Sequence, residues 1–252
     1  MIPELGRFPA SWLTDAELSL TVGRPERVGL SFFSADTTAF YAFGEQIGLP
    51  AAARADEERL RACFDLPPRH WVKLRYLAGE RVGCSQYFAI HQRNVYPVTT
   101  LRLFARQFGV RDVTRIEALL APALERDDTS WIVSLKREQL AAEPRFSCRL
   151  PRTVVPRLFE TAVEEGYLER ERAEQYLAWN RNLEAGDAAH VTFDPLRQEL
   201  GGLDYENPAP DSLPAGWQQA TTGFAAGPPR YLKCRLASGA TRPEWVIYLN
   251  AR

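Results

Sequence analysis

The chain has 252 residues, of which 45% are hydrophobic and 25% are charged, and its net charge is −1. A chain of this kind can bury a large core, and its balanced charge argues against nucleic-acid and membrane-surface partners. The N-terminus carries no leader pattern and no stretch reaches about 18 apolar residues, so we expect a cytoplasmic protein with a single domain over residues 1–252.

Period-two alternation of apolar and polar residues predicts five pairs of strands along the chain. Each pair consists of two short alternating runs that are separated by a turn or a loop. The pattern is weakest in the second strand of the fourth pair. The predicted pairs are residues 17–22 with 28–32, 71–76 with 82–90, 132–136 with 146–150, 190–194 with 203–205, and 231–236 with 245–250.

Two helical segments are predicted after each of the first three strand pairs. The first of each two ends at a glycine, namely Gly48, Gly109 or Gly166, and glycine is preferred just beyond a helix C-terminus. The chain is therefore expected to repeat a strand–strand–helix–helix unit of about sixty residues. Residues 207–229 contain five prolines and are expected to form a loop instead of a helix.

Only three of the 31 basic residues are lysines, and all three lie in alternating runs: Lys73, Lys136 and Lys233. One face of each strand pair is apolar and is expected to pack against helices, which leaves a polar face on the other side. An open sheet would present that face to water. About ten antiparallel strands can instead close into a barrel, which makes the polar face an interior. We therefore predict an α/β fold with a closed antiparallel barrel inside a ring of helices.

The cysteines predict buried free thiols and no metal site. Their spacing contains no CxxC motif, and no histidine stands at a zinc-ligand offset from them. Three of the four lie at apolar positions of predicted strands. The four residues are Cys63, Cys84, Cys148 and Cys234.

The predicted architecture, with a polar and aromatic-lined interior, resembles the aromatic prenyltransferases of the ABBA, or prenyltransferase-barrel, type. Arg230-Tyr231-Leu232-Lys233 is similar to the tyrosine–lysine pattern on a late strand of that family. The chain is shorter than a typical member and has no diagnostic motif. The resemblance implies that a prenyl group is transferred from an isoprenyl diphosphate to an aromatic small molecule or a peptide side chain.

The resemblance also implies roles for the polar residues of the strands. Basic residues would bind the diphosphate, and these are Lys73, Arg75, Lys136, Arg149, Lys233 and Arg235. Tyrosines would shield the carbocation, and these are Tyr87, Tyr231 and Tyr248. The candidates for accepting the acceptor's proton are Glu17, Asp194, His91 and His190, of which Glu17 is preferred. No metal ligands are predicted; no cofactor is required by the sequence, and Mg²⁺ is left open.

Two other functions remain open on the sequence. The first is a non-catalytic barrel that binds an anionic or isoprenoid ligand. The second is a protein-interaction module whose basic sheet face docks an acidic partner, although the net charge of −1 argues against nucleic acid in that role. Cations that converge in an interior would favour the enzyme or the ligand-binding barrel, whereas a flat and solvated basic face would favour the interaction module.

Overall fold

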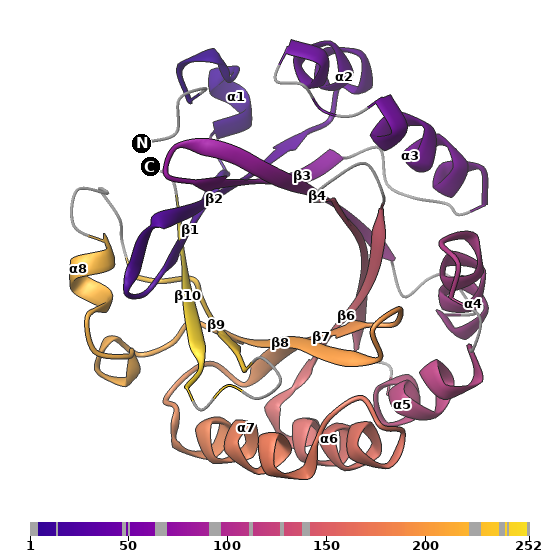
Figure 1. The fold of residues 1–252 in the computed structure, drawn as a ribbon, viewed down its shortest axis with the longest axis vertical. Helices are drawn as coiled ribbons and strands as arrows, with labels where there is room; N and C mark the ends of the chain where they lie inside the picture. The colour runs from indigo at the N-terminus through magenta and orange to yellow at the C-terminus, as the bar shows by residue number, and fades with distance from the viewer. Residues whose placement is uncertain are drawn as a thin grey trace.

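Ten strands of the computed structural model form a closed antiparallel barrel with helices around its outside, as predicted (Figure 1). The second strand of the fourth pair, which had the weakest pattern, is present as β8. The structure describes residues 5–13, 15–46, 49, 51–63, 70–90, 97–110, 113–126, 129–137, 142–221, 228–236, 240 and 242–250. The Gly48 helix stop lies outside these residues.

The strands alternate with pairs of helices in the order that the repeat predicts. The strands are β1 (Glu17–Thr21), β2 (Arg24–Ser34), β3 (His70–Leu77), β4 (Glu80–Ile90), β5 (Ser130–Arg137), β6 (Glu143–Pro151), β7 (Ala188–Asp194), β8 (Glu199–Glu206), β9 (Tyr231–Arg235) and β10 (Glu244–Asn250). The helices are α1 (Ala10–Leu13), α2 (Thr37–Gln46), α3 (Ala51–Cys63), α4 (Pro97–Gln107), α5 (Thr114–Leu124), α6 (Val155–Glu164), α7 (Arg170–Asn182) and α8 (Trp217–Thr221). Short 3-10 turns are formed by Leu5–Arg7, Arg152–Val154 and Pro210–Ser212.

Each strand pairs with the strands before and after it in the chain, and β1 closes the barrel on β10, where Ser19 lies opposite Tyr248. The direction of the chain therefore alternates around the barrel. The connections within the pairs β1–β2, β3–β4, β5–β6, β7–β8 and β9–β10 all lie at one end, which we call the hairpin end. The connections that contain helices lie at the opposite end, the helix end.

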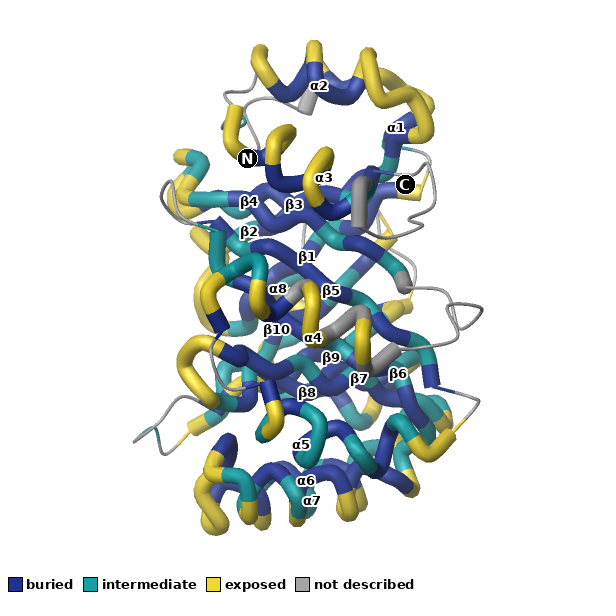
Figure 2. The backbone as a smooth tube through the Cα atoms, turned by 90° about the vertical axis from the view of Figure 1, so that its right-hand side faces the viewer, coloured by how far each residue is buried: buried dark blue, intermediate teal, exposed yellow. Residues whose placement is uncertain are grey.

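The outward faces of the strands pack against the helices and form the main core. Figure 2 shows a largely buried barrel, whereas the helices are exposed on their outer sides. Side chains from both layers, such as Leu135, Phe146 and Phe159, are almost completely buried. One apolar residue of β4 departs from this pattern: Val82 is 42% exposed. The β3–β4 register shifts between Arg75 and Tyr76, which interrupts the alternation at that place.

The ends of several helices and the cysteines have well-defined surroundings. Asp36 caps α2, because its carboxylate accepts a hydrogen bond from the backbone N–H of Ala39 at 2.9 Å. Gly109 and Gly166 follow their helices with φ values of +83° and +75°. The cysteines Cys84, Cys148 and Cys234 are free and buried, as predicted. The side chain of Cys63 lies outside the described part of the chain.

The segment 207–229 is not a loop throughout, which corrects the prediction. It contains the 3-10 turn Pro210–Ser212 and the short helix α8. None of its prolines lies inside α8: Pro210 begins the 3-10 turn, and Pro214 precedes α8 and accepts a hydrogen bond from the backbone N–H of Trp217 at 3.2 Å. Leu213 is buried in a small cluster with Leu20 and Ile247, so the segment packs against β1 and β10.

Buried charges also join the helices to the outside of the barrel wall. Arg137 on β5 is ion-paired with Asp56 on α3 and donates a hydrogen bond to Gln86 Oε1 on β4 at 2.8 Å. A second group lies beside it, where Glu57 Oε1 is 2.8 Å from His70 Nδ1. Arg137 and His70 on the strands therefore have acidic partners on α3, which join this helix to the barrel wall. Among the described residues, no helix is both long enough and apolar enough to cross a membrane.

Candidate active site

The interior of the barrel brings together four basic side chains from two strands that are distant in the sequence. Lys73 and Arg75 lie on β3, and Lys233 and Arg235 lie on β9; we call these four residues the cation group. They alternate with outward residues such as Leu74 and therefore point inward. On each strand the cations lie toward the hairpin end. The two lysines are buried, with 8% and 7% of their surface exposed.

Lys73 is the central member of the cation group. Burial lowers the pKa of its ammonium well below the usual value, and the positive charges of Arg235, Lys233 and Arg75 lower this pKa further. Its Nζ donates a hydrogen bond to Tyr248 Oη at 3.1 Å and lies 4.3 Å from the centre of that ring. Within the described part of the chain Lys73 makes no ion pair. Its charge is balanced by the hydroxyl and ring face of Tyr248 and, without an ion pair, by the negative charges of Asp204 and Glu17.

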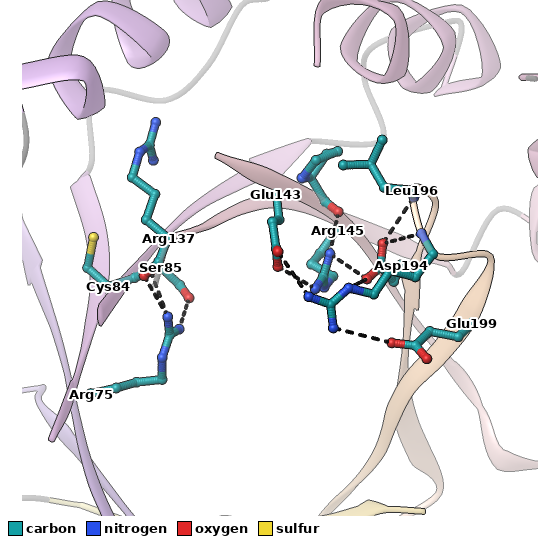
Figure 3. Close-up of polar contacts among 11 residues, drawn as sticks. Arg75, Cys84, Ser85, Arg137, Glu143, Arg145, Asp194, Leu196 and Glu199 are labelled. Carbon is teal, nitrogen blue, oxygen red and sulfur yellow. Dashed lines mark hydrogen bonds and ion pairs between the residues drawn. The ribbon is translucent and has the colours of Figure 1, made fainter. Parts of the chain in front are cut away.

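Arg75 is held toward the hairpin end by neutral groups of β4 and β5 (Figure 3). Its guanidinium donates hydrogen bonds to Ser85 Oγ at 2.6 Å and to the backbone oxygen of Arg137 at 2.8 Å. These contacts fix the direction of the side chain without cancelling its charge. Fixed donors of this kind cost little reorganisation when an anion binds.

Lys233 differs from Lys73 because a carboxylate lies beside it. Its Nζ is 2.6 Å from Asp204 Oδ2, and both side chains are buried. Burial lowers the pKa of Lys233, and the negative charge of Asp204 partly opposes this shift. Asp204 was not predicted from the sequence, although it stands two residues before Glu206 on the inward face of β8. The weak alternation of that strand hid this signal.

Aromatic rings line the interior beside the cation group. Trp71 and Tyr87 stack with their centres 4.5 Å apart, and Phe33 extends the stack at the helix end of β2 and β3. Tyr231 and Tyr248 meet edge to face at 6.2 Å on the other side. Burial raises the pKa of the Tyr87 and Tyr248 phenols, which keeps them neutral at ordinary pH. The rings therefore offer uncharged faces next to fixed cations.

Glu17 lies on the inward face of β1 toward the helix end. Its Oε1 is 2.9 Å from Arg230 Nη1, and its side chain is 7% exposed. Burial raises the pKa of this carboxyl above its usual value, although the charges of Arg230 and Lys73 oppose the shift. A carboxylate of this kind is more basic than a solvated glutamate and is suited to accepting a proton.

The structure does not bring Arg149 into the cation group. Its guanidinium makes a two-bond contact with Glu206, at 2.7 and 2.8 Å, toward the helix end. His190 also lies 2.8 Å from Glu206, and these two partners lower the pKa of Glu206 to about 2. Lys136 is half-buried on β5 toward the hairpin end, opposite Ser85.

Asp194 occupies a different setting from Glu17, at the hairpin end of β7 (Figure 3). Its carboxylate is 2.9 Å from Arg145 Nη1 and accepts hydrogen bonds from the backbone N–H groups of Leu196 and Arg197. These contacts stabilise the β7–β8 turn. His91, the other candidate base, lies outside the described residues.

The inward side chains were also compared with the requirements of a metal site. Among the described residues, no group of three or more His, Cys, Asp or Glu side chains is arranged to hold a metal ion. Asp204 and Glu17, which face the interior, are each paired with a basic residue. The described residues therefore provide no set of ligands for Mg²⁺.

Comparison with known proteins places the fold. No protein-family model matches the chain, and no curated protein matches its sequence. Among solved structures, the chain is similar to 6-dimethylallyltryptophan synthase from Micromonospora olivasterospora, crystallised in complex with DMASPP and Trp. The TM-score is 0.61 at 14% identity, and the match covers 97% of this chain and 86% of that one. This likeness shows that the chain has the prenyltransferase-barrel fold.

Proposed function

We propose that the barrel transfers a prenyl group from an allylic diphosphate to an aromatic small molecule or a peptide side chain. The observation that carries this proposal is the convergence of Lys73, Arg75, Lys233 and Arg235 inside a closed barrel, next to neutral tyrosine rings. The barrel fold that it shares with 6-dimethylallyltryptophan synthase supports the same reaction class. Closure of the sheet also argues against a flat basic face as a docking surface.

The cation group would bind the diphosphate and stabilise it as it leaves. Ionisation of the allylic C–O bond places additional negative charge on the departing diphosphate. At an effective dielectric constant of about 20, a cation about 4 Å from a negative oxygen contributes roughly 4 kcal/mol before desolvation is subtracted. Several fixed cations therefore lower the barrier to ionisation substantially.

The aromatic rings and Glu17 would serve the second half of the reaction. The carbocation is attracted to the faces of Tyr87, Tyr231 and Tyr248, and these rings exclude water that would quench it. The electron-rich acceptor forms a bond to the carbocation and then loses a proton. Glu17 is the proposed acceptor of that proton, since Asp194 is occupied by Arg145 and by the β7–β8 turn. No step of this proposal passes through Mg²⁺.

Titration calorimetry with thiolo-analogues of dimethylallyl and geranyl diphosphate tests the donor site. We expect micromolar binding by the wild-type protein and loss of most of that affinity in Lys233→Ala. Arg157→Ala is the matched control, because Arg157 is an exposed cation on α6 that pairs with Glu125 outside the barrel. If the folded wild-type protein binds neither analogue, the proposal is wrong.

A screen of acceptors tests the transfer itself. Dimethylallyl diphosphate is incubated with the protein and a panel of indoles, phenols and peptides containing tryptophan or tyrosine, and products are identified by a mass gain of one prenyl unit. A product that forms with wild type and not with Glu17→Gln would support transfer. Donor binding without any product across the panel would favour the non-catalytic ligand-binding barrel.

A further inference from the structure

Two parts of the barrel wall carry closely similar sequences. Strand β3 reads Trp71-Val72-Lys73-Leu74-Arg75 and strand β9 reads Tyr231-Leu232-Lys233-Cys234-Arg235, so both present an aromatic residue, a lysine and an arginine on the inward face. Their neighbours also match, with Gly29-Leu30-Ser31 on β2 and Gly202-Leu203-Asp204 on β8. We call these two parts the β2–β3 clamp and the β8–β9 clamp.

The two clamps also share their register and the position of the lysine. Ser31 lies opposite Lys73, and Asp204 lies opposite Lys233. A Cβ at Gly29 would be 2.5 Å from Lys73 Cε, and a Cβ at Gly202 would be 2.7 Å from Lys233 Cε. Each lysine stem therefore lies directly over a glycine of the neighbouring strand. The clamps present their ammonium groups to the interior in a similar way.

One position gives the clamps a different charge, because Ser31 in the first is replaced by Asp204 in the second. Lys73 Nζ consequently contacts the hydroxyl and ring of Tyr248, whereas Lys233 Nζ is 2.6 Å from a buried carboxylate. Among the described residues, Lys73 of the β2–β3 clamp makes no ion pair with a carboxylate. The β8–β9 clamp already contains an anion that belongs to the protein.

We propose that Asp204 is a specificity-determining residue that competes with the diphosphate group for Lys233 and thereby limits how tightly the barrel holds inorganic diphosphate. This proposal rests on the proposed function, in which the cation group binds the diphosphate. Inorganic diphosphate, the second product, carries at least as much negative charge as the donor and has no prenyl group to be held by the tyrosine rings. Without a competing carboxylate, four convergent cations would favour the product over the donor.

The carboxylate acts differently on the two ligands. Both the donor and the product must share Lys233 with Asp204, and both are repelled by it. The donor recovers affinity through its prenyl group, which packs against apolar and aromatic surface, and the product does not. The contribution of the prenyl group is the same with and without Asp204, so the effect of Asp204 on the ratio of donor affinity to product affinity depends on ligand charge. Inorganic diphosphate can carry one more negative charge than the donor, so Asp204 repels it more strongly, and removal of Asp204 is expected to lower that ratio.

Calorimetric titration with inorganic diphosphate tests the role of Asp204 directly. We compare wild type, Asp204→Asn and Asp204→Ser at several pH values, because burial lowers the pKa of Lys233 and the charge of Asp204 opposes that shift. Both variants are expected to bind inorganic diphosphate about tenfold more tightly, since a repulsive charge within contact distance of the site is lost. Their affinity for the dimethylallyl thiolo-analogue should rise by a smaller factor. Unchanged or weaker binding of inorganic diphosphate by the folded variants would overturn the proposal.

Ser31→Asp is the matched variant, because it places a carboxylate opposite Lys73 and makes the first clamp resemble the second. We expect it to weaken inorganic diphosphate binding about tenfold. Thermal unfolding shows whether the Asp204 variants fold. If they do not, the Ser31→Asp variant still tests the proposal. No weakening in a folded Ser31→Asp protein would overturn the proposal.

The outcomes separate this inference from the proposed function. If the thiolo-analogue binds and Lys233→Ala weakens it, but the Asp204 variants bind inorganic diphosphate no more tightly, the donor site stands and the role of Asp204 is wrong. If the variants tighten inorganic diphosphate binding but no prenyl analogue binds, Asp204 controls an anion site and prenyl transfer is wrong.

Discussion

Arg137 and Lys73 are both buried basic residues of the barrel wall, but they face opposite sides of it. Arg137 points outward and is ion-paired with Asp56, while Gln86 accepts a further hydrogen bond from it. Lys73 points inward and meets only a tyrosine hydroxyl and ring, and three further cations lower its pKa. The outer charge is neutralised by an ion pair. Of the inner cations, Lys233 is paired with Asp204 and Arg235 lies 3.9 Å from Glu244, whereas Lys73 makes no ion pair among the described residues. We propose that outer charges hold the fold together and that inner charges are arranged for an anionic ligand.

The largest effect on stability is expected on the outer side. Arg137→Met leaves Asp56 without its buried partner and should lower the free energy of unfolding by about 3 kcal/mol. This is the lower end for a broken buried pair, because Asp56 also contacts Arg59. Urea unfolding measures the loss, and a combined Arg137→Met, Asp56→Leu variant should recover part of it. Binding of the thiolo-analogue should not change; a large loss of affinity would contradict the separation of the two sides.

Glu17 provides the next test, now on the inner side. Glu17→Gln keeps the shape and removes the base, so kcat for prenyl transfer should fall about a hundredfold while donor affinity stays the same. Steady-state rates and calorimetry measure these two quantities separately. Asp194→Asn is the comparison, and it should affect thermal stability more than kcat because Asp194 holds a turn. Equal rates for Glu17→Gln and wild type would rule out Glu17 as the proton acceptor.

Lys73→Met tests whether an inner cation serves the ligand and not the fold. The affinity for the thiolo-analogue should fall about tenfold to thirtyfold, which corresponds to roughly 1.5–2 kcal/mol for a lost charged contact. Stability should stay the same or increase, because a buried and unpaired ammonium is replaced by an apolar side chain. A marked drop in the unfolding temperature of Lys73→Met would show that Lys73 is structural.

The smallest expected effect is a dependence of donor binding on pH. The pKa of Lys73 lies well below its usual value, so the free protein loses this proton as pH rises through the lowered pKa. The affinity for the donor is therefore highest below that pKa and decreases above it. This decrease should be no larger than the loss of affinity caused by Lys73→Met. Lys73→Arg should remove part of this decrease, because arginine keeps its charge. Calorimetric titrations at a series of pH values measure this decrease, and identical profiles for wild type and Lys73→Arg would be inconsistent with a titrating Lys73.

Part of the candidate site follows from local sequence pattern. The alternation in Trp71–Arg75 and Tyr231–Arg235 already places the basic residues on the polar faces of strands, since successive side chains point to opposite sides. The same pattern failed at β8, where glycines interrupt the alternation and conceal Asp204. It also could not separate Arg149 from the other cations. Glu206 comes from a strand 57 residues further along the chain, and its ion pair takes Arg149 away from the cation group.

The sequence by itself determined the repeating strands and helices, the polar face of each strand and the presence of lysine there, because these depend on side-chain direction within a few residues. Only the tertiary structure decided which polar residues meet. Lys73 and Tyr248 are 175 residues apart and touch only because β1 pairs with both β2 and β10. Barrel closure joins the first and last strands, and such long-range register depends on all ten strands together. The uneven distribution of charge across the barrel wall is therefore a property of the closed barrel.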